Sequence, residues 1–406
     1  MSCVDPLLTL ADARERITQT IALADGSETI DLAQANGRVL AAPVHATHDV
    51  PPFACSAMDG YALRHADVHP GVRLAVMDAV HAGYVYAGRL HPGTCVRILT
   101  GAPIPADADA VVMQEQVSLE QGEIVIQEPV QAGEHIRPQG DDVRQGDQMM
   151  PAGHRLIPEN IGAIAATGLD RVKVKPNPRI AMLATGDELC APGQVPGPGH
   201  IHESNRHLLM ALLDELGLTA TDKGIIPDDP NILRQTLLEA AAESDVILTT
   251  GGASVGDADW VVQTVRELGE VYFWQVAIKP GKPFLFGRIG KSWLFGMPGN
   301  PVAVAVTFRQ LVYPGLMALM GCAVTKPLRF NARTLTPLKK RPGRLEFRRA
   351  YISVDDNGFP VVAALHKQGS HQLSTYCQSN GFIVLEPNSS GTVECGYVTV
   401  ELFPNF

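Results

Sequence analysis

The segment from residue 179 to 252 decides the fold, because apolar runs rich in β-branched residues alternate in it with runs of helical periodicity. It reads, in order, RIAMLATG (179–186), NRHLLMALLDELG (205–217), TATDKGII (219–226), NILRQTLLEAAAE (231–243) and DVILTTGG (245–252). Strands that alternate with helices predict a parallel sheet with helices on both faces. Ligands of such sheets bind beyond the carboxyl ends of the strands. We therefore expect functional residues in the loops that follow these strands.

The same alternation continues to residue 321. The further runs are WVVQTVRELG (260–269), VYFWQVAIK (271–279), FLFG (284–287), SWLFG (292–296) and VAVAVTFRQLVYPGLMALMG (302–321). The α/β pattern therefore covers one continuous part of the chain, and the segments on either side of it differ in character.

Short alternating strands and turns are typical of both flanks. Residues 47–143 are rich in Gly, Pro, Val and Thr, which predicts an antiparallel β module, and residues 327–406 form another unit of short strands. We predict a multidomain α/β plus β fold with a mostly parallel central sheet. Its predicted domains are an N-terminal/linker domain of 1–46 and 144–177, an inserted β-rich domain of 47–143, an α/β domain of 178–326 that ligands would use, and a C-terminal β-barrel-like domain of 327–406.

Composition excludes several classes of protein. The 406 residues include 33 Lys and Arg against 43 Asp and Glu, which gives a formal net charge of −10. A general basic surface for nucleic acid or anionic lipid is therefore not expected, and an anionic ligand would need a local basic pocket. Hydrophobic residues make up 45% and charged residues 19%, which excludes a disordered chain. The 38 Gly and 30 Pro indicate many short elements joined by turns.

Cysteine usage and the N-terminus favour a cytoplasmic protein. The seven cysteines contain no C-x-x-C pair, which argues against a disulfide framework or a zinc knuckle. The first 24 residues carry acids and arginines at helical spacing, so they predict an amphipathic helix and not a signal peptide. No run approaches the roughly 18 uncharged apolar residues of a membrane span. We expect neither a membrane nor a nucleic-acid partner.

Three glycine- and proline-rich turns are candidate anion sites. TTGGASVGD (249–257) follows a predicted strand and precedes a helix, so its backbone N–H groups could surround a phosphate or a similar oxyanion. In IKPGKPFLFG (278–287), Lys279 and Lys282 flank a tight Pro-Gly turn, and in GMPGNPVAV (296–304), Asn300 and Pro301 suit a helix start. Each of these could be an ordinary turn. Their succession at the ends of one predicted sheet favours an anion site.

Acidic residues stand in turn contexts along the same chain. Asp59, Asp142, Glu188, Asp228 and the pair in VGDADW (255–260) are examples. Such residues more often cap helices or form Asx-turns than catalyse reactions. Carboxylates beside a phosphate site would nevertheless suit Mg²⁺, which bridges carboxylate and phosphate oxygens.

Seven motifs in a fixed order carry a family resemblance. They are PPFACSAMDGYA (51–62), RILTGAPIPADADAVVMQE (97–115), RPQGDDVRQGD (137–147), ATGDEL (184–189), TTGGASVGDADW (249–260), IKPGKPFLFG (278–287) and GMPGNPVAV (296–304). The chain resembles the molybdopterin molybdenumtransferase family, which includes MoeA and the gephyrin E domain. The resemblance implies an elongated four-domain homodimer whose active cleft lies between subunits. It also implies that adenylylated molybdopterin and molybdate react, with Mg²⁺ assisting, to give molybdenum cofactor and AMP.

The resemblance also implies roles for individual residues. Asp228 and Asp259 would hold Mg²⁺, Lys279 would stabilise developing negative charge, and Asp59 or Asp142 would orient the substrate or the metal, with Glu188 as a further catalytic carboxylate. The implied substrate-binding residues are Thr100, Gly251, Gly252, Ser254, Gly256, Lys282, Pro298, Asn300, Pro301, Arg349 and Ser370. Gln275 departs from the family pattern, because relatives commonly have a lysine at that position.

Two other functions compete with this interpretation. The α/β segment alone resembles molybdopterin adenylyltransferase, an enzyme that could otherwise be a partner delivering the substrate. The long segments on either side of the α/β pattern argue against that activity. A non-catalytic scaffold resembling gephyrin is the second alternative, and the retained carboxylates argue against it.

Overall fold

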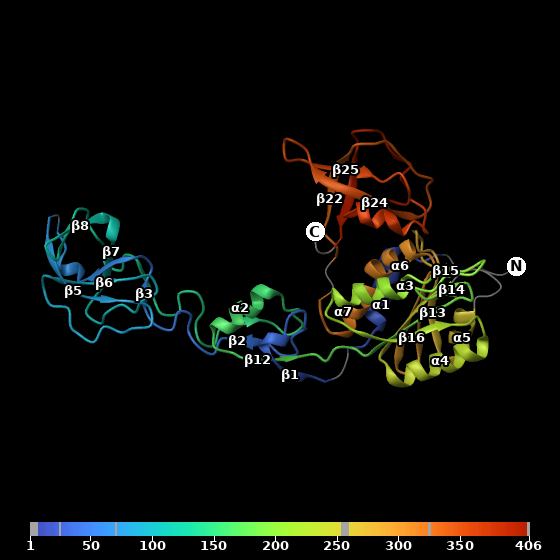
Figure 1. Ribbon diagram of the computed structural model, residues 1–406, viewed down its shortest axis with the longest axis horizontal. Coiled ribbons are helices and arrows are strands. Elements are labelled where there is room, and N and C mark those ends of the chain that lie inside the picture. The colour runs from blue at the N-terminus through green and yellow to red at the C-terminus, as the bar shows by residue number, and fades with distance from the viewer. Residues whose placement is uncertain (1–6, 24–25, 70, 253–259, 324–325, 404–406) are drawn as a thin grey trace.

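The structure is a computed structural model that describes residues 7–23, 26–69, 71–252, 260–323 and 326–403. Figure 1 shows an elongated molecule with a β-rich module at one end, a small unit around α2 (Pro158–Ala166) next to it, and an α/β unit at the other end. A C-terminal β unit lies against the α/β unit. These groups match the predicted multidomain α/β plus β fold class.

The central sheet has six strands in the order β16-β13-β17-β21-β20-β18. The first four are parallel, and their bounds are Ala220–Ile226 (β16), Ile180–Thr185 (β13), Val246–Thr250 (β17) and Ser292–Met297 (β21). The last two, Leu285–Ile289 (β20) and Glu270–Trp274 (β18), are antiparallel to their neighbours. Gly290 and Lys291 alone join β20 to β21, and so short a connection can only make an antiparallel hairpin. The predicted parallel arrangement therefore holds for the four strands that carry the glycine loops and carboxylates.

Alternating residues of β13 explain why helices cover both faces of the sheet. Ile180 and Met182 belong to a core cluster that includes residues of α3 (Asn205–Asp214) and α6 (Pro301–Thr307). Ala181 and Leu183 belong to a second cluster with residues of α4 (Pro230–Glu243) and α5 (Trp260–Leu268). Successive side chains of a strand point to opposite faces, and every residue of β13 is buried.

The helix starts follow from local sequence. Asp229 is the N-cap of α4, where its side chain accepts hydrogen bonds from the backbone N–H groups of Asn231 and Ile232, and Pro230 occupies the first turn.

After α6 the helix continues through a π turn (Phe308–Val312) into α7 (Tyr313–Leu319). The stretch Pro301–Leu319 has the length and apolar character of a membrane span, but 83% of its most apolar window is buried inside the protein. This burial is typical of a core helix.

The N-terminal amphipathic helix forms as predicted, over α1 (Leu10–Thr20), with Thr9 as its N-cap. Its buried residues Leu10, Ala13 and Ile17 join the core cluster of α3 and α6. The helix therefore packs on the α/β unit. This packing differs from the predicted division, which placed all of residues 1–46 with 144–177.

Residues 28–45 and 148–174 pair with each other in a small unit around α2. β1 (Glu28–Asp31) pairs with β12 (Arg171–Val174), and β2 (Val44–His45) pairs with β11 (Gln148–Met150). The chain between them forms the β-rich module, whose main sheet has the order β7-β4-β6-β5-β9-β8. Its strands are β4 (Gly60–Leu63), β5 (Arg73–Val80), β6 (Thr94–Ile98), β7 (Ala110–Met113), β8 (Val117–Glu120) and β9 (Glu123–Ile126). The sequence predicted an antiparallel module, but the pair β5–β6 is parallel, so the sheet is mixed.

The C-terminal unit closes on itself as a barrel-like sheet. Its order is β19-β24-β25-β22-β28-β26, and an additional pairing joins β24 to β26. The strands are β22 (Arg329–Thr334), β24 (Leu345–Val354), β25 (Pro360–Ala364), β26 (Gly381–Leu385) and β28 (Tyr397–Leu402), with β19 (Ile278–Lys279) supplied by the α/β segment. A strand from one unit thus becomes part of the sheet of another.

Removing the central ring of the aromatic cluster tests the α/β core. Phe286 is fully buried, and its ring centroid lies 5.4 Å from those of Tyr272 and Phe295 and 5.7 Å from those of Phe273 and Trp293. We expect Phe286→Ala to lower the free energy of unfolding by about 3–5 kcal/mol, because it leaves a cavity. All three tryptophans, at 260, 274 and 293, lie in this unit, so urea unfolding followed by tryptophan fluorescence reports on it.

The matched control is Phe359→Ala, at a ring that is 67% exposed in the C-terminal unit. It should leave the fluorescence transition unchanged. An equal midpoint for Phe286→Ala and the wild-type chain would contradict the assignment of this core.

Candidate active site

The carboxyl ends of the parallel strands bring three acidic residues together. Asp187 and Glu188 follow β13, and Asp228 follows β16, the adjacent strand. The backbone N–H of Asp228 donates to Asp187 Oδ1 at 3.1 Å, and that of Asp187 donates to Asp228 Oδ2 at 3.4 Å. The predicted site residues Glu188 and Asp228 therefore lie in one cluster of carboxylates at the sheet edge.

Partial burial and neighbouring negative charge raise the pKa of one member of this cluster. The pKa of Asp228 is raised above its ordinary value, first by partial desolvation and then by the charges of Asp187 and Glu188. A cation or a hydrogen-bond donor bound there would relieve the repulsion. The cluster is therefore suited to hold a positively charged group.

Glycines let the neighbouring loops approach each other. Gly251 and Gly252 follow β17 with φ of +81° and +60°. A Cβ on Gly251 would lie 2.4 Å from the carbonyl oxygen of Thr185, so no larger residue fits there. A Cβ on Gly299, in the loop after β21, would lie 3.8 Å from the Cα of Gly251. The ends of β13, β17 and β21 thus converge on one small region.

Unpartnered polar atoms face this convergence. The hydroxyl groups of Thr185 and Thr249 and the side-chain oxygen of Asn205 are buried and have no hydrogen-bond partner among the residues that the structure describes. The Asn205 amide donates to the carbonyl oxygen of Gly299 at 2.7 Å, and the Thr185 hydroxyl oxygen would lie 3.0 Å from a Cβ on Gly251 and 2.9 Å from one on Gly252. Buried polar groups are normally satisfied, so these atoms indicate a place for a polar ligand.

A cavity of about 530 Å³, here called the interdomain cleft, lies between the α/β unit and the C-terminal unit. It brings together five predicted site residues: Lys279, Lys282, Pro298, Asn300 and Ser370. The carbonyl of Ser370 accepts a hydrogen bond of 3.1 Å from the backbone N–H of Val302 in the first turn of α6. Pro301 begins that helix, as predicted from its position after Asn300.

Arg349 stands behind this cleft and does not line it among the described residues. Its side chain is fully buried, and Nη2 donates to the carbonyls of Lys367 and Gly369 at 3.1 Å each. Nε and Nη1 have no hydrogen-bond partner in the described part of the chain. Burial lowers the pKa of Arg349. The guanidinium therefore holds the segment that carries Ser370 and keeps unused donors that suit an anion.

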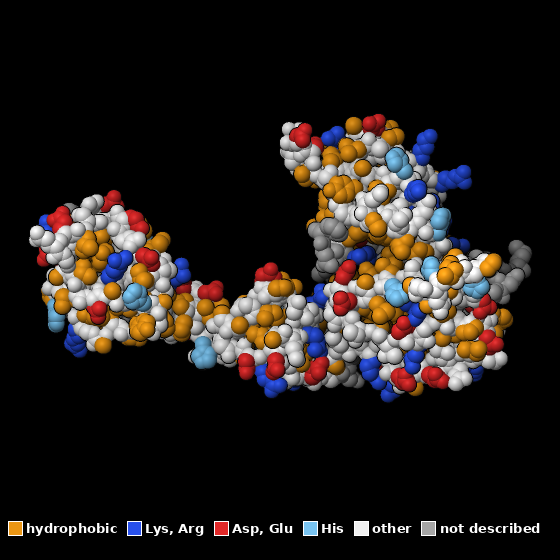
Figure 2. Space-filling view, in the orientation of Figure 1, with side chains coloured by type: hydrophobic (Ala, Val, Ile, Leu, Met, Phe, Trp, Pro, Cys, Tyr) orange, Lys and Arg blue, Asp and Glu red, His pale blue; other side chains and the backbone are white. Residues whose placement is uncertain are grey.

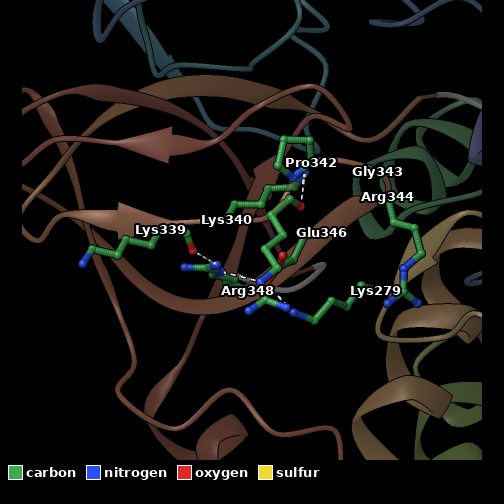
Figure 3. A pocket seen from close by; sticks show the side chains of 9 residues that line it. Lys279, Lys339, Lys340, Pro342, Gly343, Arg344, Glu346 and Arg348 are labelled. Atoms are coloured by element: carbon green, nitrogen blue, oxygen red, sulfur yellow. Dashed lines mark hydrogen bonds and ion pairs between the residues drawn. The ribbon is translucent and has the colours of Figure 1, made fainter.

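Lys279 is held at the junction of the two units by β19. Its ammonium group lies 3.4 Å from a carboxylate oxygen of Glu346, which is buried and also accepts from Arg348 Nε at 2.9 Å. Figure 3 shows Glu346 between these two cations. More than half of the Lys279 side chain remains exposed, so its ammonium group is accessible to a ligand.

Asp59 and Thr100 form a separate pair in the β-rich module. Asp59 Oδ1 accepts hydrogen bonds from the Thr100 backbone N–H at 2.8 Å and from its hydroxyl at 2.7 Å. These two bonds lower the pKa of Asp59, so it stays ionised. Figure 1 places this module at the opposite end of the molecule from the α/β unit. Within one chain, the pair is therefore far from the interdomain cleft.

Asp142 lies exposed in the loop that follows β10 (Ile136–Arg137), and its backbone N–H donates to the carbonyl of Val50. That loop is organised by Asp49, which accepts from the Gln145 N–H at 2.7 Å and the Gln139 amide at 2.6 Å. The structure does not bring Asp142 together with the carboxylates of the α/β unit.

Three family models match almost the whole chain. They are described as the MoeA N-terminal region (domains I and II) over residues 8–168, a probable molybdopterin binding domain over 181–318, and the MoeA C-terminal region (domain IV) over 331–403. A protein of Haemophilus influenzae named molybdopterin molybdenumtransferase is 38% identical over 400 residues, which cover 98% of this chain and 99% of that relative. This chain belongs to the MoeA family. The predicted resemblance is confirmed.

Further relatives and solved structures agree. A Nostoc protein of the same name is 36% identical over 88% of this chain and 85% of its own length. The crystal structure of a molybdopterin biosynthesis moeA protein from Pyrococcus horikoshii has a TM-score of 0.83 and 30% identity, covering 98% of this chain and all of that one. The family thus extends over the complete arrangement of units and not over the α/β unit alone.

Some site predictions lie outside the described residues, and some site residues were missed. Ser254, Gly256 and Asp259 fall in the segment 253–259, which the structure does not describe. Asp187 was missed although it stands beside Glu188 at the end of a predicted strand, which is the signal that could have found it. Arg344, Glu346 and Arg348 line the cleft from β24 and the segment before it, and nothing in their spacing relates them to Lys279.

Neutralising Asp228 tests the carboxylate cluster. A carboxyl group whose pKa is raised by folding destabilises the fold when ionised, and this cost disappears as the pH falls below that pKa. We therefore expect Asp228→Asn to raise the melting temperature at pH 7 in chelator-containing buffer. The difference from the wild-type chain should shrink as the pH approaches 4. Thermal unfolding at several pH values measures it.

The adjacent variant Asp229→Ala is the control with the opposite sign. It removes the N-cap of α4 and should lower stability by about 1 kcal/mol. A lower melting temperature for Asp228→Asn at pH 7 would contradict the inferred charge repulsion.

Proposed function

We propose that this chain inserts molybdenum into molybdopterin by using adenylylated molybdopterin and molybdate, with release of AMP. The chain is a transferase of molybdenum cofactor biosynthesis, as its family and its full-length relatives indicate. The observation that carries the detailed proposal is the interdomain cleft, where Lys279, Lys282, Asn300 and Ser370 meet beside the converging glycine loops. Such a cleft offers both positive charge and backbone donors to oxyanions.

The arrangement suits cleavage of a phosphoanhydride. An oxygen nucleophile, from molybdate or water, attacks the anhydride, one P–O bond forms while another breaks, and AMP is released. Such reactions need positioning and neutralisation of charge more than covalent catalysis. Lys279 supplies positive charge at the cleft, and Gly251 and Gly252 let the backbone approach the phosphates. Arg349 would support molybdate binding through the segment that carries Ser370.

Mg²⁺ is proposed as the cofactor, held at the carboxylate cluster. Among the described residues, no group of three His, Cys, Asp or Glu side chains is placed to hold a metal ion by itself. Mg²⁺ commonly uses only one or two carboxylates and takes its other ligands from phosphates and water, so Asp228, with its raised pKa, fits this need. Glu188 and Asp259 would complete the protein side of the site. When bound, the ion would neutralise charge on the anhydride oxygens.

The active site is proposed to be shared between two copies of the chain. Asp59 and Thr100 form a preorganised pair, yet the same chain holds them far from the interdomain cleft. A homodimer in which the module of one subunit reaches the cleft of the other would bring them, with Asp142, to the substrate. A cytoplasmic location and delivery of the substrate by an adenylyltransferase complete the proposal.

The central experiment is molybdate-dependent AMP release from adenylylated molybdopterin. We expect the wild-type chain to release AMP only with molybdate and Mg²⁺, and Asp228→Asn to be slower by about 100-fold or more, because charge stabilisation is lost. Asp12→Asn, at an exposed site of α1, is the matched control and should have the wild-type rate. Absence of molybdate-dependent release, or pyrophosphate release from Mg-ATP and molybdopterin instead, would contradict the proposal.

Mixing two inactive variants tests whether the site is shared. Asp59→Asn and Asp228→Asn should each be inactive alone. Random assortment of the two chains by co-expression gives half heterodimers, each with one intact site, and therefore about a quarter of the wild-type activity. A shared site predicts this recovery, whereas a site within one subunit predicts none.

A further inference from the structure

A second cavity, of about 620 Å³, adjoins the interdomain cleft and shares Lys279, Arg344, Glu346 and Arg348 with it. We call this cavity the basic pocket. Its other lining residues are Lys339, at the end of β23 (Leu338–Lys339), and Lys340, Arg341, Pro342 and Gly343 of the loop that leads to β24. Figure 3 shows these side chains around the cavity. Its volume is within the range of small-molecule sites.

Positive charge in the basic pocket is largely uncompensated. Six of the nine lining residues are cationic, and the single carboxylate among them, Glu346, is already paired with Lys279 and Arg348. Lys339 and Arg341 form no ion pair with any residue in the described part of the chain. In a chain of net charge −10, such a concentration focuses an attractive field for anions at one place.

The loop that carries this charge is fixed in position. Lys340 is buried, and its ammonium group donates to the carbonyls of Pro387 at 3.0 Å and Ser389 at 3.4 Å. The backbone N–H of Gly343 donates to the same Pro387 carbonyl at 2.8 Å, and β23 pairs with β27 (Gly391–Thr392). Binding an anion would therefore cost little ordering of the backbone.

The groups available select a phosphate and not a base. Guanidinium and ammonium groups recognise phosphate oxygens through charge-assisted hydrogen bonds. No aromatic ring is among the described residues that line the pocket, so a nucleobase would find nothing to stack on. A phosphomonoester carries a charge of about −1.5 to −2 at neutral pH. The same phosphate within an anhydride carries about one unit less, so a site with excess positive charge prefers the cleaved form.

We propose that the basic pocket binds a dianionic phosphomonoester, and that it receives the phosphate of AMP once the anhydride next to it has been cleaved. This inference rests on the proposed function, because it assigns a place to the product of that reaction. Lys279 lines both cavities, so it would contact the phosphate both before and after the anhydride is cleaved. Lys339 and Arg341 would contact it only after release.

Calorimetric titration of the full-length chain with AMP, inorganic phosphate and adenosine tests this site. In the double variant Lys339→Ala/Arg341→Ala, AMP should bind at least about tenfold more weakly, and affinity should fall less steeply with added salt. Lys291→Ala removes one positive charge at the β20–β21 turn, at the other end of β21 from the cleft residues Pro298 and Asn300, and should stay within twofold of the wild-type chain. An unchanged affinity in the double variant, or adenosine binding as tightly as AMP, would overturn the inference.

Comparing the affinities of AMP and inorganic phosphate identifies the source of the bound phosphate. AMP binding at least tenfold more tightly than inorganic phosphate identifies the mononucleotide, and equal affinities lost together in the double variant identify free phosphate; both support the phosphate site. The inference and the proposed function fail separately. If the chain releases AMP in the presence of molybdate but the double variant binds AMP as tightly as the wild-type chain, only the inference about the basic pocket is contradicted. If the double variant loses AMP binding but the wild-type chain shows no molybdate-dependent AMP release, only the proposed function is contradicted.

Discussion

The pairing of β19 with β24 is the contact on which the rest of the cleft depends. Ile278 and Lys279 leave the α/β segment and align in parallel with Leu345 and Glu346 of the C-terminal unit. The flanking backbone strengthens this junction, since Leu345 donates to the carbonyl of Ala277 and Ala277 donates to that of Leu8. One short segment therefore joins the N-terminus, the α/β unit and the C-terminal unit. It also sets Lys279 at the boundary between two cavities.

Opposite charges gather in different places around this junction. Carboxylates gather at the ends of β13 and β16, where partial burial and, to a smaller extent, its acidic neighbours raise the pKa of Asp228. Cations gather on the other side, around Lys279 and the loop before β24. Glu346 lies among these cations and pairs with Lys279 of the α/β segment and Arg348 of the C-terminal unit. A ligand with phosphates near one end and a bound cation near the other matches this order of charges.

The sequence predicts those parts of the site that depend on local chemistry. The alternation of apolar runs and the turn residues between them locate β13, β17 and β21. Because the carboxyl ends of parallel strands lie at the same edge of the sheet, the convergence of Glu188, Asp228 and Gly251 follows. The break at Gln275 does not follow. VYFWQVAIK was predicted as one strand-like run, but Gln275 has a φ of +89°, ends β18 one residue earlier and lets β19 enter another sheet. A non-glycine residue in that conformation is stabilised by distant pairing, which local pattern does not encode.

The position of Asp59 relative to the α/β unit is likewise not encoded in the local sequence pattern. Its motif predicts a functional carboxylate, and the structure supports this by giving it two hydrogen bonds from Thr100 that keep it ionised. Nothing in the sequence says where the β-rich module points, because that depends on how the small unit around α2 joins it to the rest. Asp59 is preorganised, and within one chain it lies far from the cations around Lys279. The proposal that a second copy completes the site therefore rests on the elongated shape of the chain, which keeps the Asp59–Thr100 pair away from the interdomain cleft.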